Sequence, residues 1–330
     1  MTPVRPAVTT GLSTDSAWTV ADALLAKRGH SFHLARRLLS ARHAARATRL
    51  YGWCRLMDDL ADDLADEGPS KAAAQAALAA VRLALQSGQC GDAATSDMLL
   101  LMRECGIAAA IPLDLIQGIE SDLGTVRIGD LNELLGYAYR VAGTVGLMMT
   151  AALDVTLPEA LPHAIDLGIA MQLTNICRDV RADALLGRRY LPASLMGAVE
   201  PSALVAPVGE VRANAAHAMR ALLDVADRHY ASGEQGLRYL PAGARAGILV
   251  AARVYREIGV VLRRREFDCW SARAHVGTAA KAAITLSALS GTVALRRLSA
   301  EDMTHGQTLH QQRLTGATWA KLAIGADLGH

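Results

Sequence analysis

The stretch MQLTNICRDVRAD, residues 171–183, carries two helical patterns at once. Its apolar residues recur at three- and four-residue spacing, which predicts a helix with a buried side; they are Met171, Leu173, Ile176 and Val180. A second stripe of the same helix advances by three, four and four positions and is polar; it consists of Gln172, Asn175, Asp179 and Asp183. Surface helices turn such a stripe to water, so its chemistry needs a further clue before it indicates a site.

A second acidic stretch supplies that clue. In CRLMDDLADDLAD, residues 54–66, Asp58 and Asp62 are four residues apart, as are Asp179 and Asp183. This spacing places each pair on one face of a helix. Two carboxylates about 5 Å apart repel by roughly 3 kcal/mol at an effective dielectric near 20, and Mg²⁺, which prefers oxygen ligands, would relieve that repulsion. Either stretch alone is typical of a solvated helix end, whereas the two together favour a metal site.

The composition limits the class of protein. The 330 residues are 52% hydrophobic and 20% charged, which excludes a largely disordered chain. The net charge of +2 comes from interspersed charges, so nucleic acid is not expected as a partner. Five cysteines without a CxxC pair indicate free thiols. We see no secretory signal, and uncharged stretches such as 141–153 fall short of the about 20 residues that a spanning helix needs.

Helical periodicity runs through most of the chain and predicts an all-α fold. It covers 34–66, 71–86, 131–153, 163–185, 211–231 and 244–266. Short breaks, such as the one expected at Ser232-Gly233, separate these segments. We expect a single helical domain over 29–296, a partly flexible extension over 1–28, and a tail or loosely docked helix over 297–330.

Three blocks together resemble the squalene and phytoene synthase family: CRLMDDLADD, YAYRVAGTVGLMM and AMQLTNICRDVRADALLGRRYLP. The resemblance covers roughly residues 30 to 295. It implies an isoprenoid-synthase fold, in which helices surround a central cavity with both aspartate motifs at its mouth. It also implies head-to-head joining of two prenyl diphosphates through a cyclopropylcarbinyl diphosphate. The second and third blocks are most similar to the bacterial branch that converts two C20 geranylgeranyl diphosphates to phytoene, although Arg189 stands where a smaller or apolar residue is common.

The resemblance also implies roles for particular residues. The metal ligands, for Mg²⁺ or alternatively Mn²⁺, would be Asp58, Asp62, Asn175, Asp179 and Asp183. The same four aspartates with Arg55, Arg178 and Tyr137 would form the catalytic set. The substrate-binding residues would be Ser31, Phe32, Val141, Ala142, Val145, Gly146, Gln172, Asn175, Tyr190 and Tyr255. One of the arginines 263–265 could lie near a diphosphate.

From the residues alone, other interpretations stay open for this set. Arg55 and Arg178 could equally form ion pairs with neighbouring aspartates. Gly143 and Gly146 could serve close helix packing, and each tyrosine could be a core residue. The amides of Gln172 and Asn175 could belong to a buried network that satisfies them.

Two alternatives to phytoene synthesis remain at this stage. One is a C15-using sibling that makes presqualene diphosphate, squalene or dehydrosqualene; the other is an inactive relative that serves as an assembly factor. We expect no nicotinamide cofactor. The expected partners are prenyl diphosphates, a membrane surface and other carotenoid-pathway enzymes, with a cytoplasmic location at the periphery of the inner membrane.

Overall fold

The computed structural model describes residues 38–62 and 71–295. The expected extension over 1–28, the tail over 297–330, and the candidates Ser31 and Phe32 lie outside the described residues. The side chain of Asp62, the last residue of the first described helix, lies outside them as well.

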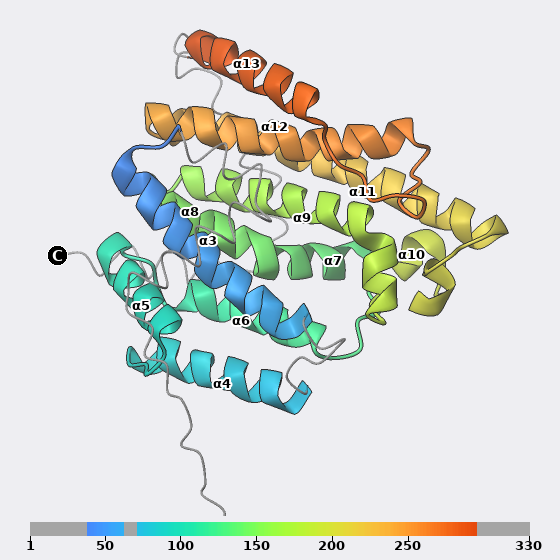
Figure 1. Cartoon of the computed structure of the whole chain (residues 1–330), viewed down its shortest axis with the longest axis horizontal. Helices are drawn as coiled ribbons and strands as arrows, with labels where there is room; N and C mark the ends of the chain where they lie inside the picture. Colours follow the sequence, from blue (N-terminus) through green and yellow to red (C-terminus); the bar gives the residue numbers. More distant parts are fainter. Residues whose placement is uncertain (1–37, 63–70, 296–330) are drawn as a thin grey trace, which may run out of the picture.

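Helices make up almost all of the described structure, as the sequence predicts (Figure 1). In chain order they are α3 (Ala41–Asp62), α4 (Lys71–Ser87), α5 (Ala93–Cys105), α6 (Ala110–Asp122), α7 (Leu131–Ala138), the π-helical turn η1 (Tyr139–Gly143), α8 (Thr144–Ala152), α9 (Ala160–Leu185), α10 (Ala193–Met196), the 3₁₀ turn η2 (Pro201–Leu204), α11 (Gly209–Gly236), the 3₁₀ turn η3 (Leu237–Tyr239), α12 (Ala242–Arg264) and α13 (Thr278–Leu295). The described residues contain no β-strand, only an isolated bridge between Arg127 and Arg189. Within the described ranges, no helix combines the length and apolarity needed to cross a membrane.

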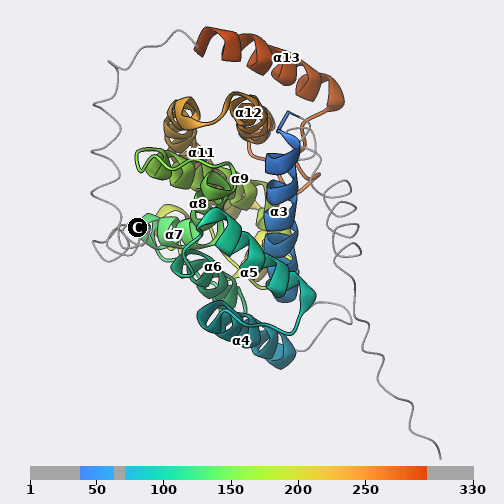
Figure 2. The same cartoon turned by 90° about the vertical axis from the view of Figure 1, so that its left-hand side faces the viewer.

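The long helix α9 lies in the middle of the molecule and organises it. It packs against α8, η1, α11 and α12, while α4 and α13 lie at opposite edges in both views (Figures 1 and 2). The apolar stripe predicted from residues 171–183 is largely buried, because Leu173, Ile176 and Val180 all belong to the main core. Met171 differs, since it is only partly buried and borders a cavity described below.

Glycines set how closely α9 approaches its neighbours. A Cβ atom on Gly168 would lie 2.3 Å from the carbonyl oxygen of Ala142, and one on Gly146 would lie 2.2 Å from that of Ala164. Both distances are too short for any real side chain, so α8 and η1 can touch α9 only because these positions are glycine. Close helix packing, which the sequence left open as an explanation for the glycines of the GTVG block, therefore applies to Gly146.

The helix break expected at Ser232-Gly233 is wrong, because α11 continues to Gly236. The glycine is retained for a different reason: a Cβ atom at Gly233 would lie 2.9 Å from the Cβ of Leu167 on α9. Close contact between two helices, rather than termination of one, explains the residue.

The C-terminus of α9 is closed by a Schellman motif. Gly187 adopts the left-handed conformation with φ of 72°, and its N–H bonds the carbonyl of Ala184 at 3.0 Å. The N–H of Arg188 bonds the carbonyl of Asp183 at 2.9 Å. This pair of bonds is the standard way to satisfy the last carbonyls of a helix, and it fixes the direction in which the chain leaves α9.

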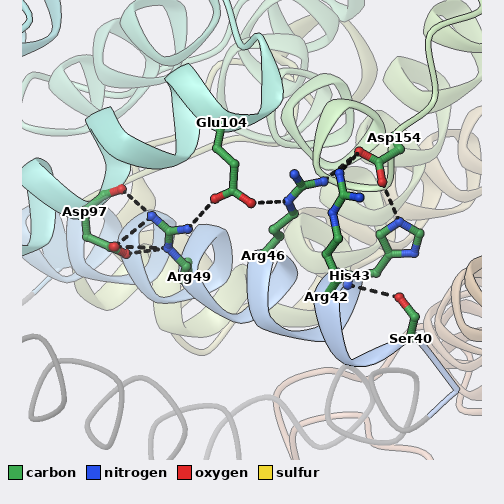
Figure 3. Close-up of polar contacts among 8 residues, drawn as sticks. All are labelled: Ser40, Arg42, His43, Arg46, Arg49, Asp97, Glu104 and Asp154. Carbon is green, nitrogen blue, oxygen red and sulfur yellow. Dashed lines mark hydrogen bonds and ion pairs between the residues drawn. The ribbon is translucent and has the colours of Figure 1, made fainter.

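Helix α3 carries its charges in the reverse of the order that its own dipole favours. Most of its basic residues lie in the first half, with Arg55 in the second, and its aspartates lie within the last five residues. In the first half, buried Arg46 donates to Glu104 at 2.7 Å and to Asp154 at 2.6 Å, while Arg49 donates to Asp97 at 2.9 Å (Figure 3). Hydrogen bonds from Arg46 and then His43 lower the pKa of Asp154. Acidic side chains from other segments thus compensate the first half of the helix.

Candidate active site

A cavity of about 960 Å³ runs between α3, α8, α9, α11 and α12. Residues of α9 that line the cavity recur every three or four positions from Ala160 to Arg178, which is a length of about 27 Å along the helix. Most of its wall is apolar or small, with Val141, Val145 and Met149 on one side and Ile248 and Val254 on the other. The space therefore suits a long hydrocarbon chain.

One end of this cavity is strongly polar. Tyr51, Arg55 and Asp58 from α3 face Gln172, Asn175 and Arg178 from α9, and Arg273, His275 and Lys281 complete the rim. Both helices reach this end close to their C-termini, and neither has a basic residue in its last turn. The aspartates there lie at the negative ends of two helix dipoles, so the region attracts cations.

Arginine side chains form ion pairs with the aspartates near the polar end of the cavity. Arg55 forms an ion pair with Asp59, one turn further along α3. Asp179 accepts hydrogen bonds from Arg178 at 3.0 Å and from Arg273 at 2.7 Å. Burial of Asp179 would by itself raise its pKa, but these two guanidinium groups more than offset burial and hold the pKa below its usual value. The carboxylate is therefore charged at neutral pH. The ion pairs considered from the sequence for Arg55 and Arg178 are both formed.

Asn175 points to a ligand more directly. Its Oδ1 atom is buried and has no hydrogen-bond partner within the described part of the chain. A buried amide oxygen without a partner costs about 1–3 kcal/mol, so a group that binds to it is expected. The amide network considered from the sequence therefore does not satisfy this residue.

The donor set at this end fits a divalent cation with oxygen ligands. Asp58 and Asn175 both border the cavity, and Asp179 lies one turn beyond Asn175 on α9. Among the described residues, no three His, Cys, Asp or Glu side chains form a ready-made metal cluster. An all-protein cage is not required for Mg²⁺, which commonly takes one or two carboxylates and completes its shell with water and substrate phosphate.

The cavity brings together ten of the residues that the sequence singles out: Arg55, Asp58, Val141, Ala142, Val145, Gly146, Gln172, Asn175, Arg178 and Tyr255. Four others do not border it. Asp179 lies behind Arg178, and Asp183 borders a much smaller pocket together with Arg188 and Tyr190. Tyr137 and Tyr190 are buried elsewhere. The remaining three are Ser31, Phe32 and Asp62, whose side chains lie outside the described residues.

Tyr137 and Tyr190 form a compact cluster with Asp122 at the end of α6. Their rings stack with centroids 4.9 Å apart, and their hydroxyls donate to Asp122 at 2.8 and 2.6 Å. Burial, followed by the charge of Asp122, raises the pKa of both phenols, so both stay protonated. In this structure the two tyrosines join α6, α7 and the GRRYLP segment, and any direct contact with substrate stays a prediction.

Arg273 was not predicted from the sequence, although it borders the cavity and binds Asp179 through two nitrogen atoms. Its segment, 269–277, has no helical period and no motif spacing that could have indicated it. The arginine triplet 263–265 seemed the better candidate, but Arg263 donates to Asp224 and Asp227, and none of the three borders the cavity. Lys281 on α13 was missed for the same lack of a local pattern.

Comparison with known proteins identifies the family of this chain. The family model described as squalene/phytoene synthase matches residues 25–280. A phytoene synthase of Pseudescherichia vulneris is 33% identical over 274 residues, covering 80% of this chain and 88% of that protein. A phytoene synthase of Cereibacter sphaeroides is 36% identical over 255 residues, covering 74% and 71%.

Among solved structures, a ligand-bound dehydrosqualene synthase superimposes with a TM-score of 0.72 at 24% identity, covering 85% of this chain and 98% of that one. A squalene synthase HpnC from Alicyclobacillus acidocaldarius gives a TM-score of 0.65 at 18% identity, covering 77% and 95%. These likenesses confirm the isoprenoid-synthase fold. The chain belongs to the squalene/phytoene synthase family, and it is an enzyme of the prenyltransferase type.

Proposed function

We propose that this enzyme joins two geranylgeranyl diphosphates head to head, through a cyclopropylcarbinyl diphosphate, to give phytoene for carotenoid biosynthesis. The relatives at 30–36% identity named phytoene synthase support the choice of this reaction within the family. The observation that carries the proposal is the shape of the cavity: a long apolar space that ends in a cluster of arginines, an aspartate and an unsatisfied amide oxygen.

The polar end accounts for binding and release of diphosphate. Arg55, Arg178 and Arg273 border the cavity there, and planar guanidinium groups bind phosphate oxygens through paired hydrogen bonds. Because their charge is permanent, they also stabilise the negative charge that develops on a leaving diphosphate. Two of them are held by Asp179, so their positions are set before substrate arrives.

The apolar part accounts for control of the carbocation. Once diphosphate leaves, the cation must be kept from water, and the valine, methionine, leucine and glycine residues that make up most of the wall do not react with it. Tyr51 and Tyr255 also border the space, and aromatic faces stabilise a cation without reacting with it. The C15-using siblings share this chemistry, so the discriminating property is the length of chain that the cavity accepts.

We propose Mg²⁺, with Mn²⁺ as a substitute, as the metal for this reaction. Asp58, Asn175 and Asp179 would hold it, together with Asp62 and Asp183 as the family resemblance implies. When bound, such an ion acts as a Lewis acid on the diphosphate oxygens. The unpartnered Oδ1 of Asn175 and the paired helix C-termini support this assignment.

A product assay tests the reaction. Purified enzyme is given Mg²⁺ and either the C15 or the C20 prenyl diphosphate, without a nicotinamide cofactor, and the extracted hydrocarbon is identified by mass. We expect a C40 product from the C20 substrate. A C30 hydrocarbon, or a cyclopropyl diphosphate that accumulates from the C15 substrate, would instead assign the chain to the sibling branch.

The substrates and product are lipophilic, and for this reason we propose a peripheral association with the inner membrane and with other carotenoid-pathway enzymes. Flotation of the purified protein with vesicles of bacterial lipid tests the membrane contact. Protein that stays at the bottom of the gradient at every lipid concentration would refute it.

A further inference from the structure

Helix α3 itself stabilises its C-terminal end through the ion pair of Arg55 with Asp59. Its last turn contains Asp59 and Asp62 and no basic residue, although the C-terminus of a helix favours positive charge. The last four carbonyls of a helix also lack partners within it. The contacts that stabilise this end of α3 therefore also fix the position of the first aspartate motif.

A side chain from a distant segment contributes to this compensation. Arg188 is buried, with 7% of its surface exposed, and its Nη2 donates to the carbonyl oxygen of Ala61 at 2.8 Å. The two residues are 127 positions apart in the chain. Ala61 lies in the last turn of α3, three residues after Asp58, so a guanidinium group caps this helix from outside.

The backbone of the same residue closes the other motif. The N–H of Arg188 bonds the carbonyl of Asp183 in the Schellman motif that ends α9. Arg188 thus connects the last residue of the second aspartate motif, through its N–H, with the last turn of the first, through its guanidinium. The left-handed conformation of Gly187 sets the direction of the chain at this point.

We propose that Arg188 is a positioning residue that fixes the end of α3 against the end of α9 and thereby sets the separation of the two aspartate motifs. The inference rests on the metal site of the proposed function. It predicts that Arg188 influences the affinity for divalent cations without binding substrate itself, in the way that residues behind metal ligands do.

The neighbouring Arg189 offers a matched control. It is equally buried, with 4% of its surface exposed, but its Nη1 donates to the carbonyls of Ile128 and Leu191 and not to either aspartate helix. Loss of a buried arginine at either position removes hydrogen bonds of the same kind. Only at Arg188 does the loss release an aspartate motif.

The experiment measures binding of Mn²⁺ with inorganic pyrophosphate to the full-length protein, by calorimetry and by the electron spin resonance signal of free Mn²⁺. We expect Arg188→Gln to weaken this binding by about 10-fold to 100-fold, Arg188→Lys to retain most of it because one donor is kept, and Arg189→Gln to leave it unchanged. Thermal unfolding with EDTA present reports the purely structural cost of each change.

The proposal is overturned if Arg188→Gln binds the metal and pyrophosphate as the wild type does, or if Arg189→Gln weakens binding equally. Should Arg188→Gln fail to fold, Arg188→Lys decides: an affinity per folded molecule equal to that of the wild type counts against positioning, and a reduced affinity supports it. Wild-type protein that binds no Mn²⁺ in the presence of pyrophosphate would refute the metal site of the proposed function and leave the contacts of Arg188 as they are.

Discussion

Replacement of Ala164 by phenylalanine tests whether the depth of the cavity selects the substrate. Ala164 borders the cavity on α9, eleven residues before Asn175, which places it about 16 Å from the polar end. Extended C15 and C20 isoprenoids reach roughly 14 and 19 Å from their first carbon, as judged from carbon–carbon bonds of about 1.5 Å in a zigzag. Position 164 therefore meets the last isoprene unit of the C20 chain and lies beyond the end of the C15 chain.

The size of the effect follows from the carbon atoms that lose their place. An isoprene unit has five carbons, and at about 0.8 kcal/mol for each buried carbon its burial is worth about 4 kcal/mol, close to a thousandfold in kcat/KM. We expect Ala164→Phe to lower kcat/KM for geranylgeranyl diphosphate by about 100-fold to 1000-fold and to change that for the C15 substrate by less than about 10-fold.

The assay compares both substrates with each variant under single-turnover conditions, with hydrocarbon products quantified by mass. Ala182→Phe is the matched control, since Ala182 lies on the same helix and is exposed to solvent. A folded Ala164→Phe enzyme with an unchanged ratio of the two kcat/KM values would refute the alignment of substrate along α9.

Three further predictions follow from the site and the fold. Asp58→Asn and Asp179→Asn should each lower turnover at least about 100-fold with the fold retained, and EDTA should abolish turnover. Persistence of product formation in any of these cases contradicts the metal role. Gly168→Ala should destabilise the protein by about 1–3 kcal/mol in urea unfolding. Gly136→Ala should stabilise it by up to about 1 kcal/mol, because no atom lies within 4 Å of the added carbon. Equal effects of the two changes would refute the close helix contact at Gly168. Asp179 has a lowered pKa in the folded protein, so its ion pairs stabilise the fold above its unfolded pKa near 4 and cease to do so as the pH falls through the folded value. Arg273→Met should therefore be less stable than the wild type at pH 7, and this difference in stability should shrink on acidification. Unfolding at pH 7 and at pH 3 measures the difference.

The polar stripe of α9 was predictable because helical geometry alone determines it. Once residues 171–183 form a helix, Gln172, Asn175, Asp179 and Asp183 must share a face, and the apolar residues between them must face elsewhere. The structure places Gln172 and Asn175 at one end of the cavity together with Arg178, whereas Asp179 and Asp183 do not border it. Local periodicity was sufficient because both the cause and the consequence lie within one helix.

Tertiary contacts could not be obtained in the same way. Gly233 looks like a helix break in the sequence, and only the nearness of Leu167 on another helix explains why it continues one. Arg273 contacts Asp179 from a segment without regular structure, 94 residues away. Neither contact has a period or a spacing, so the chain had to be folded before either could be recognised.

The charge order of α3 connects fold and function. A helix with basic residues first and acidic residues last opposes its own dipole, which costs stability at both ends. At the first end Asp154 and Glu104 compensate with fixed ion pairs to Arg46, and no diffusible ion is needed. At the last end Arg55 pairs with Asp59 and the guanidinium of Arg188 binds the carbonyl of Ala61, while Asp58 borders the cavity. The negative charge and the carbonyls at this end lie close to the polar part of the cavity, so the divalent cation that we propose would add a further positive charge at the same helix end.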